Sequence, residues 1–334
     1  MAEGADLPFG LASAVGPVPF ASADDAVAFA LRRPRYPTVP VTSDPSASLW
    51  AQAVSGLDDG IGADADAAGA DLSGPPFASA RAFVDALGRL DAASVPVAIR
   101  VPVLGPVTVA SELRRLGRPA EDADRIAVEV VSARAVALLG LIRAAAVSAS
   151  AAAPVVSVVL EEPGLVGSMH PTFPRRPAEI RSLLDPVIDA LDRAAPTRSL
   201  LIGVHVAGPC DWPSVIGSGA SLLCVPVDRT VSGWAPLFGD LLDRGGRICW
   251  GVVPVDRPLG RSTDRYWRRL VALWTAMVAE GVDPMALRLR SSFSPADGLD
   301  AFGPSQAELV MELTAEVAER VSHQAVAARL SLGA

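Results

Sequence analysis

Short apolar runs rich in β-branched residues recur along the chain, separated by longer segments with helical periodicity. Six of these runs are almost continuously apolar, which is typical of strands buried on both faces of a parallel sheet. They span residues 97–105, 155–163, 200–208, 221–227, 247–254 and 287–293. Two weaker runs precede them, at residues 11–16 and 36–41. The pattern therefore predicts about eight strands.

The segments between these runs predict helices, because their apolar residues recur at three- and four-residue spacing. The predicted helices span residues 22–31, 121–148, 177–194, 233–242, 263–280 and 305–329. Strand and helix alternate to the end of the chain, which favours one α/β domain over residues 1–334, a single (β/α)8 TIM barrel. A doubly wound sheet is the competing prediction. Segment 55–76, rich in Gly, Ala and Asp, predicts a flexible insertion.

Composition and charge narrow the functional classes. The formal net charge is −8 and the basic residues are dispersed, so the sequence predicts no nucleic-acid-binding surface. The chain has no Lys, which excludes Schiff-base chemistry. The apolar run 136–147 contains Arg143 and is shorter than the roughly 18 residues of a membrane span, so no membrane partner is predicted. With no basic N-terminal segment and three cysteines, we expect a cytoplasmic protein with free thiols.

Motifs at the ends of the predicted strands are the candidates for chemistry, because barrel active sites lie at the carboxyl ends of strands. These motifs are GPVPF (16–20), GPVT (105–108), EEPG (161–164), HVAGPCDW (205–212), WGVVP (250–254) and SPADGL (294–299). In this order they resemble the motifs of the C-terminal barrel of cobalamin-independent methionine synthases. That family belongs to a superfamily that also contains uroporphyrinogen decarboxylase.

The resemblance implies methyl transfer from a folate or corrinoid donor to a small thiol that zinc holds as a thiolate. In the family a His and a Cys two residues apart, an acidic residue and a second Cys bind the zinc. Here His205 matches, but Ala207 stands at the first Cys position and Asp297 at the second. Zinc needs three or four ligands, so the resemblance favours no cofactor. A rearranged zinc site of His205, Cys210, Asp228 and Asp297 remains the alternative.

The resemblance also suggests which residues line the pocket. Glu161, Glu162, His205 and Asp297 are the candidate catalytic residues, and only one of the two adjacent glutamates can face the barrel axis. Gly16, Pro17, Glu161 and Trp250 are the candidate substrate-binding residues. The expected partner is a small molecule, either a thiol or an amino acid. Two hypotheses follow for the function of the chain. The chain is either a divergent methyltransferase or a non-catalytic or metal-free small-molecule-binding barrel that has lost the ancestral methyltransferase activity.

Overall fold

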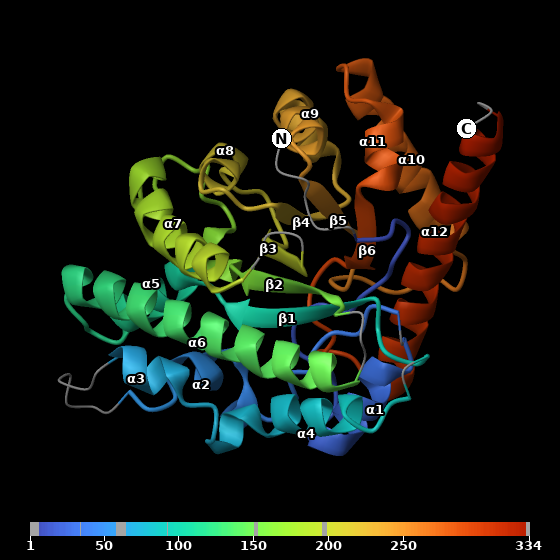
Figure 1. Cartoon of the computed structure of the whole chain (residues 1–334). Helices are drawn as coiled ribbons and strands as arrows, with labels where there is room; N and C mark the ends of the chain where they lie inside the picture. The colour runs from blue at the N-terminus through green and yellow to red at the C-terminus, as the bar shows by residue number, and fades with distance from the viewer. Residues whose placement is uncertain are drawn as a thin grey trace.

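One parallel sheet forms the centre of the molecule (Figure 1). The computed structural model describes residues 7–33, 35–57, 65–91, 93–149, 153–195 and 199–331. In these ranges the strand order is β1-β2-β3-β4-β5-β6. The strands are β1 (Ala98–Leu104), β2 (Val155–Glu161), β3 (Leu200–His205), β4 (Leu222–Pro226), β5 (Arg247–Val253) and β6 (Ser291–Pro295). Almost every strand residue is buried, which explains the continuous apolar runs.

The α/β class is confirmed, but the prediction of a closed eight-stranded TIM barrel is wrong. The described sheet is a curled half-barrel of six strands. The predicted strands 11–16 and 36–41 form only isolated bridges: Ala12 with Phe293 on β6, Thr38 with Arg100 on β1, and Val41 with Pro17, which follows the first segment. Prolines supply the reason: Pro37 and Pro40 interrupt the second segment, and proline cannot donate to a ladder.

The last predicted strand, 287–293, also differs from the structure. Its first residues belong to a short helix, α11 (Pro284–Leu289), and β6 starts only at Ser291. Asp283 caps this helix by accepting from the backbone N–H groups of Met285 and Ala286. Asp283 followed by Pro284 is a typical helix start. The apolar residues that follow resemble the beginning of a strand, so the apolar pattern alone predicted a strand there.

The sheet curls so strongly that its first and fifth strands meet across the interior. Arg100 Nη1 on β1 donates to Cys249 Sγ on β5 at 3.8 Å, although three strands separate β1 from β5 in the ladder. The inner face carries its own small apolar cluster: Leu7, Leu11, Tyr36, Ala98, Val155, Val159, Leu201, Leu222, Cys224 and Cys249. The concave face is thus filled with side chains.

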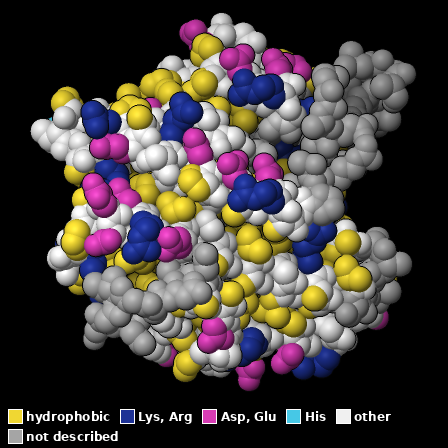
Figure 2. Space-filling model, turned by 60° about the vertical axis from the view of Figure 1, so that its left-hand side comes forward, with side chains coloured by type: hydrophobic (Ala, Val, Ile, Leu, Met, Phe, Trp, Pro, Cys, Tyr) yellow, Lys and Arg dark blue, Asp and Glu magenta, His cyan; other side chains and the backbone are white. Residues whose placement is uncertain are grey.

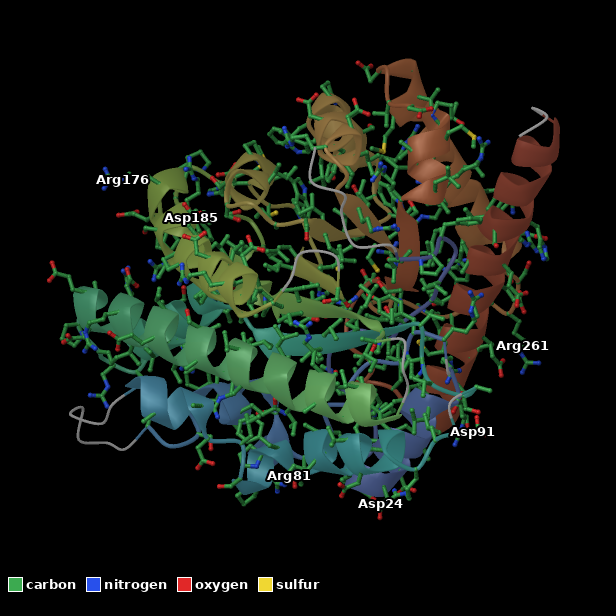
Figure 3. The ribbon with its side chains drawn as sticks, viewed as in Figure 1. Asp24, Arg81, Asp91, Arg176, Asp185 and Arg261 are labelled. Atoms are coloured by element: carbon green, nitrogen blue, oxygen red, sulfur yellow. The ribbon has the colours of Figure 1, made fainter. Side chains whose placement is uncertain are left out.

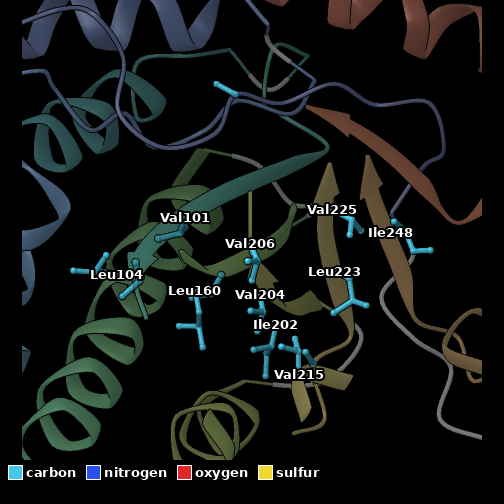
Figure 4. Packing of buried hydrophobic residues seen from close by; sticks show 14 of the residues in the cluster. Val101, Leu104, Leu160, Ile202, Val204, Val206, Val215, Leu223, Val225 and Ile248 are labelled. Carbon is cyan, nitrogen blue, oxygen red and sulfur yellow. The ribbon is translucent and has the colours of Figure 1, made fainter. Parts of the chain in front are cut away.

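Helices cover the convex face (Figure 1). They are α1 (Ala23–Leu31), α2 (Leu49–Val54), α3 (Ala65–Ala70), α4 (Ala78–Leu87), α5 (Pro106–Arg115), α6 (Ala120–Ala149), α7 (Pro177–Ala194), α8 (Trp212–Gly217), α9 (Ala235–Asp243), α10 (Asp264–Ala279), α11 and α12 (Pro304–Ser331). Short 3-10 helices are η1 (Pro45–Ala47), η2 (Pro75–Phe77), η3 (Pro163–Leu165) and η5 (Arg229–Trp234). Alternate strand residues such as Val101, Leu160 and Leu223 join the larger core with these helices (Figure 4).

Helix α6 is long and apolar enough to cross a membrane by length and composition alone. In the structure it packs against α3, α5, α7 and the outer face of β1 and β2. Its Arg134 is almost fully buried and donates to Ser55 O at 2.9 Å. Packing inside the fold therefore accounts for its apolar composition.

Charged side chains are dispersed over the surface. On the face shown in Figure 2, Arg side chains alternate with Asp and Glu side chains. Arg176, Asp24 and Arg261 project away from the ribbon (Figure 3). Several surface arginines form ion pairs with neighbouring acidic residues, such as Arg125 with Glu129 at 2.8 Å. The predicted dispersal of basic charge is visible on this face.

The segment predicted as a flexible insertion, 55–76, falls partly on residues 58–64, which lie outside the described residues. Its remaining part includes α3, which packs closely on α6. Gly69 is buried in this contact, and a Cβ there would lie 2.7 Å from both Ala133 Cβ and Val130 O. Only glycine therefore lets the two helices approach this closely.

We predict that Gly69→Ala lowers the free energy of unfolding by about 1–3 kcal/mol, because the added methyl forces α3 away from α6. Gly140→Ala is the matched control: it lies on the exposed side of α6, and nothing is within 4 Å of its added Cβ. That control should stabilise by about 0.5–1 kcal/mol through helix propensity. Urea unfolding measures the free energy of unfolding of both variants. If Gly69→Ala and Gly140→Ala change it equally, α3 does not pack against α6 as described.

Candidate active site

A buried carboxylate on β2 holds two cationic side chains on the inner face of the sheet. Glu161 Oε1 accepts from Arg100 Nη2 at 3.1 Å. Glu161 Oε2 binds His205 Nδ1, and His205 is the register partner of Glu161 on β3. Arg100 is fully buried, and the other two side chains are only 6% exposed. Three strands thus meet in one ion network.

Both ring nitrogens of His205 are engaged. Nδ1 binds the Glu161 carboxylate, and Nε2 lies 3.1 Å from the carbonyl oxygen of Ala296. Both partners are acceptors, so the geometry favours the doubly protonated imidazolium. Burial lowers the pKa of His205, but the Glu161 carboxylate outweighs burial and the net pKa is raised. Burial likewise opposes ionisation of Glu161, yet His205 and Arg100 bring its pKa below the ordinary value.

The predicted zinc ligands do not form a zinc site. A ligating imidazole must offer a free nitrogen lone pair, and His205 uses both nitrogens. Cys210 is buried, and burial raises the pKa of its thiol, which opposes the thiolate that zinc requires. Across the described ranges, no three side chains of His, Cys, Asp or Glu are placed to hold a metal ion together.

The two aspartates of the alternative zinc set have local roles. Asp228 caps η5 by accepting from Thr230 N at 2.9 Å and from Thr230 Oγ1 at 2.7 Å. Asp297 is exposed and accepts from Gly298 N at 2.8 Å. Neither carboxylate bonds to His205 or Cys210. The donor set present therefore does not fit zinc.

Glu162 points away from Glu161, towards the helix layer, as alternation along a strand requires. Its carboxylate accepts from Val107 N and Thr108 N, each at 2.8 Å, and from Thr108 Oγ1 at 2.5 Å. These donors form the N-terminus of α5, where a negative charge is favourable. Burial raises the pKa of Glu162 to about 7, although these donors pull it down. The residue links β2 to α5 and is fully buried.

Gly105 is part of the same link. A Cβ at this position would lie 2.3 Å from the Glu162 carboxyl carbon, so only glycine allows the carboxylate to reach α5. Thr108 Oγ1 also accepts from Gly164 N at 3.0 Å. The GPVT and EEPG motifs therefore form one structural unit.

The three other predicted substrate-binding residues lie in separate places. Gly16 has a positive φ of 57° in a turn, and Pro17 O accepts from Leu299 N at 2.7 Å, so this turn packs against the SPADGL loop. Trp250 is fully buried, and its Nε1 donates to Ser291 Oγ at 2.8 Å. Its ring packs edge-on against Trp274 of α10, on the convex side of the sheet. The structure does not bring Trp250 to the other candidates.

A cavity of about 250 Å³ lies over the carboxyl ends of β3 to β6. Its lining residues come from the last residues of β4 and β5, from the loops and short helices after the strands, and from α10: Ala207, Gly208, Pro209, Trp212, Pro226, Val227, Asp228, Thr230, Val231, Gly251, Pro254, Val255, Asp256, Arg257, Arg269, Ala296 and Asp297. Arg257 is paired with Asp256 at 2.7 and 2.8 Å, and Arg269 Nη2 donates to Val227 O at 2.9 Å. Asp297 and Asp228 complete its charged lining.

Sequence reasoning missed Arg100 and the two cavity arginines. Arg100 could have been found from the sequence, because it is the one charged residue in the apolar run 97–105. A charge buried in a strand needs a partner of opposite charge. Arg257 lies three residues after the end of the predicted strand 247–254, which is a second usable signal. Arg269 lies within a helix rich in Arg, and nothing in the sequence distinguishes it from Arg268.

The comparisons with known proteins do not identify a family. No family model matches the chain, and no curated protein matches its sequence significantly.

We predict that Glu161 and His205 are strongly coupled. In a double-mutant cycle with Glu161→Gln and His205→Asn, the coupling energy should be about 2 kcal/mol or more, because Glu161→Gln leaves the buried imidazolium without its anionic partner and His205→Asn leaves Glu161 with Arg100 alone. The exposed Arg125–Glu129 pair is the control, with an expected coupling of about 0.3–0.5 kcal/mol. Urea unfolding gives both values. Coupling no larger than that of the control would refute the buried pair.

The Glu162 link predicts a pH effect on stability. Since its folded-state pKa is raised from 4.5 to about 7, its contribution is greatest below pH 4.5. It falls as the pH rises through 7, by up to roughly 3 kcal/mol. The stability of the wild type relative to Glu162→Gln should therefore decline between pH 5 and pH 8 in urea unfolding. The exposed change Glu121→Gln should show no such trend, and a pH-independent difference at Glu162 would contradict the raised pKa.

Proposed function

We propose that this chain binds a small polar molecule in the cavity over β3 to β6, without zinc. One observation carries the proposal: four consecutive strand ends contribute to one cavity of about 250 Å³ that has charges of both signs. In parallel α/β sheets, ligands bind at the carboxyl ends of the strands. This cavity occupies that position.

The charges of the lining define the ligand chemistry. Asp256 already neutralises Arg257, whereas Arg269 donates Nη2 to Val227 O and has Asp228 and Asp256 as nearby negative charges. Asp297 accepts one backbone hydrogen bond and is otherwise exposed to the cavity side. We therefore propose a ligand with an ammonium or another donor group for Asp297 and an acceptor for Arg269.

Methyl transfer to a thiol is the alternative, because the strand-end motifs resemble those of methionine synthases. That reaction needs an activated thiolate, and the residues at the family's zinc positions do not supply a ligand set for it. The proposed role is accordingly a binding protein, or an enzyme that works without metal. We infer a cytoplasmic location, since all three thiols are free and buried.

Calorimetric titration of the full chain tests the proposal. The probes are homocysteine, a panel of standard amino acids, 5-methyltetrahydrofolate and methylcobalamin. For a probe that binds, Asp297→Asn and Arg269→Gln should each raise Kd at least about tenfold, because each removes a charged partner. Asp240→Asn on the exposed side of α9 is the matched control and should leave Kd unchanged.

Two outcomes would contradict the proposal. If no probe binds, or if the cavity variants and the control behave alike, the cavity is not the site. Stoichiometric zinc in protein purified without chelators, lost in His205→Ala, would restore the methyltransferase hypothesis. Methyl transfer to homocysteine would have to accompany that zinc.

A further inference from the structure

Two cysteines lie side by side on the inner face of the sheet. Cys224 on β4 and Cys249 on β5 are direct register partners in a parallel pair, and both belong to the inner apolar cluster. Neighbouring strands are roughly 4.8 Å apart, which falls within the Cα separation that a disulfide can span. Both thiols are free in this structure, and a hydrogen bond links their side chains.

The surroundings make the two thiols chemically unequal. Arg100 Nη1 lies 3.8 Å from Cys249 Sγ, and Arg100 Nε is buried without a hydrogen-bond partner. A guanidinium beside a sulfur favours the thiolate. The hydrogen bond from Cys224, with Arg100 as a further cause, lowers the pKa of Cys249 to about 5 against its burial. Burial raises the pKa of Cys224. The pair therefore combines one thiol whose pKa is lowered with one whose pKa is raised.

The pair lies directly below the cavity described above. Pro226 and Gly251 are two residues further along the same strands, so they lie on the same face as the cysteines, and both line the cavity. Ala296 packs so closely over Gly251 that a Cβ there would lie 2.8 Å from Ala296 Cα, so only a thin layer of the chain separates the cavity from the two sulfurs. The cysteines themselves are at most 1% exposed. The burial of both sulfurs excludes a bulky oxidant, so the reagent of the proposed site must be small.

We propose that Cys224 and Cys249 form a redox modification site that hydrogen peroxide converts to an intramolecular disulfide. In the first step the Cys249 thiolate attacks one peroxide oxygen. An S–O bond forms, the O–O bond breaks, and the leaving hydroxide takes up a proton to become water. In the second step the Cys224 sulfur loses its proton and displaces the sulfenic oxygen as a second water. Two thiols are oxidised and one peroxide is reduced.

Oxidation alters the interior charge balance. The disulfide carries no charge, so Arg100 loses the negative sulfur and keeps Glu161 as its anionic partner. Arg100 and Glu161 belong to the network that holds His205 against Ala296, at the rim of the cavity. The modification site and the cavity therefore share side chains, although the proposal does not depend on what the cavity binds.

The test treats reduced, folded full-length protein with hydrogen peroxide and then counts thiols by mass spectrometry after denaturation and alkylation. Two of the three thiols should disappear reversibly with dithiothreitol, with peptides of Cys224 and Cys249 joined and Cys210 alkylated. Cys249 should react roughly tenfold faster than Cys210. Cys210→Ser should behave as the wild type.

The single variants assign the order of the steps. Cys224→Ser should leave a Cys249 sulfenic acid that dimedone traps, whereas Cys249→Ser should give neither product. Circular dichroism checks that each variant folds. If a Cys→Ser variant does not fold, the Cys→Ala variant at the same position is used instead. Three results would overturn the proposal: no joined peptide in the wild type, a disulfide that includes Cys210, or a link only between separate chains on a non-reducing gel.

Discussion

The interior of this protein depends on one buried carboxylate. Glu161 binds Arg100 and His205, so a single side chain fixes the relative positions of β1, β2 and β3. Arg100 extends the network across the concave face to Cys249 on β5. Removing these charges from water costs several kcal/mol per ion, which only close pairing offsets. The network consequently tolerates few alternative arrangements, and the curled half-barrel is the shape in which all its members meet.

The sequence predicted the regular part of the fold well, because burial on both faces leaves a direct trace in a strand. The six strong apolar runs correspond to β1 to β6, with an error at Pro284–Leu289, where an Asp-Pro helix start precedes the strand. The closed barrel could not be predicted correctly by counting runs. Segments 11–16 and 36–41 are apolar because they pack beside β6 and β1, yet both form only isolated bridges, and in the second Pro37 and Pro40 interrupt the ladder. Apolar patterning reports burial, and it does not report whether a ladder forms.

The candidate site was predicted less completely, because its contacts run across strands and not along the sequence. Alternation correctly placed Glu161 and Glu162 on opposite faces, but it could not say that Glu162 would reach the N-terminus of α5. The GPVT and EEPG motifs turned out to hold each other, which is a structural reason for their joint presence. His205 was found by its motif, whereas its two acceptors, Glu161 and Ala296 O, come from residues 44 and 91 positions away. No local spacing rule contains that information.

A last step follows from comparing the interior with the cavity above it. Inside the sheet, Glu161 and His205 spend their hydrogen-bonding groups on each other and on protein neighbours. At the rim, by contrast, Asp297 and Arg269 line the cavity, and within the described residues each forms a single hydrogen bond with the protein. A ligand gains most where polar groups are already positioned and not yet satisfied. The proposed recognition would therefore belong to the rim residues, with the ion network beneath them keeping the strand ends in place and Cys249 as the sulfur of the proposed redox site below.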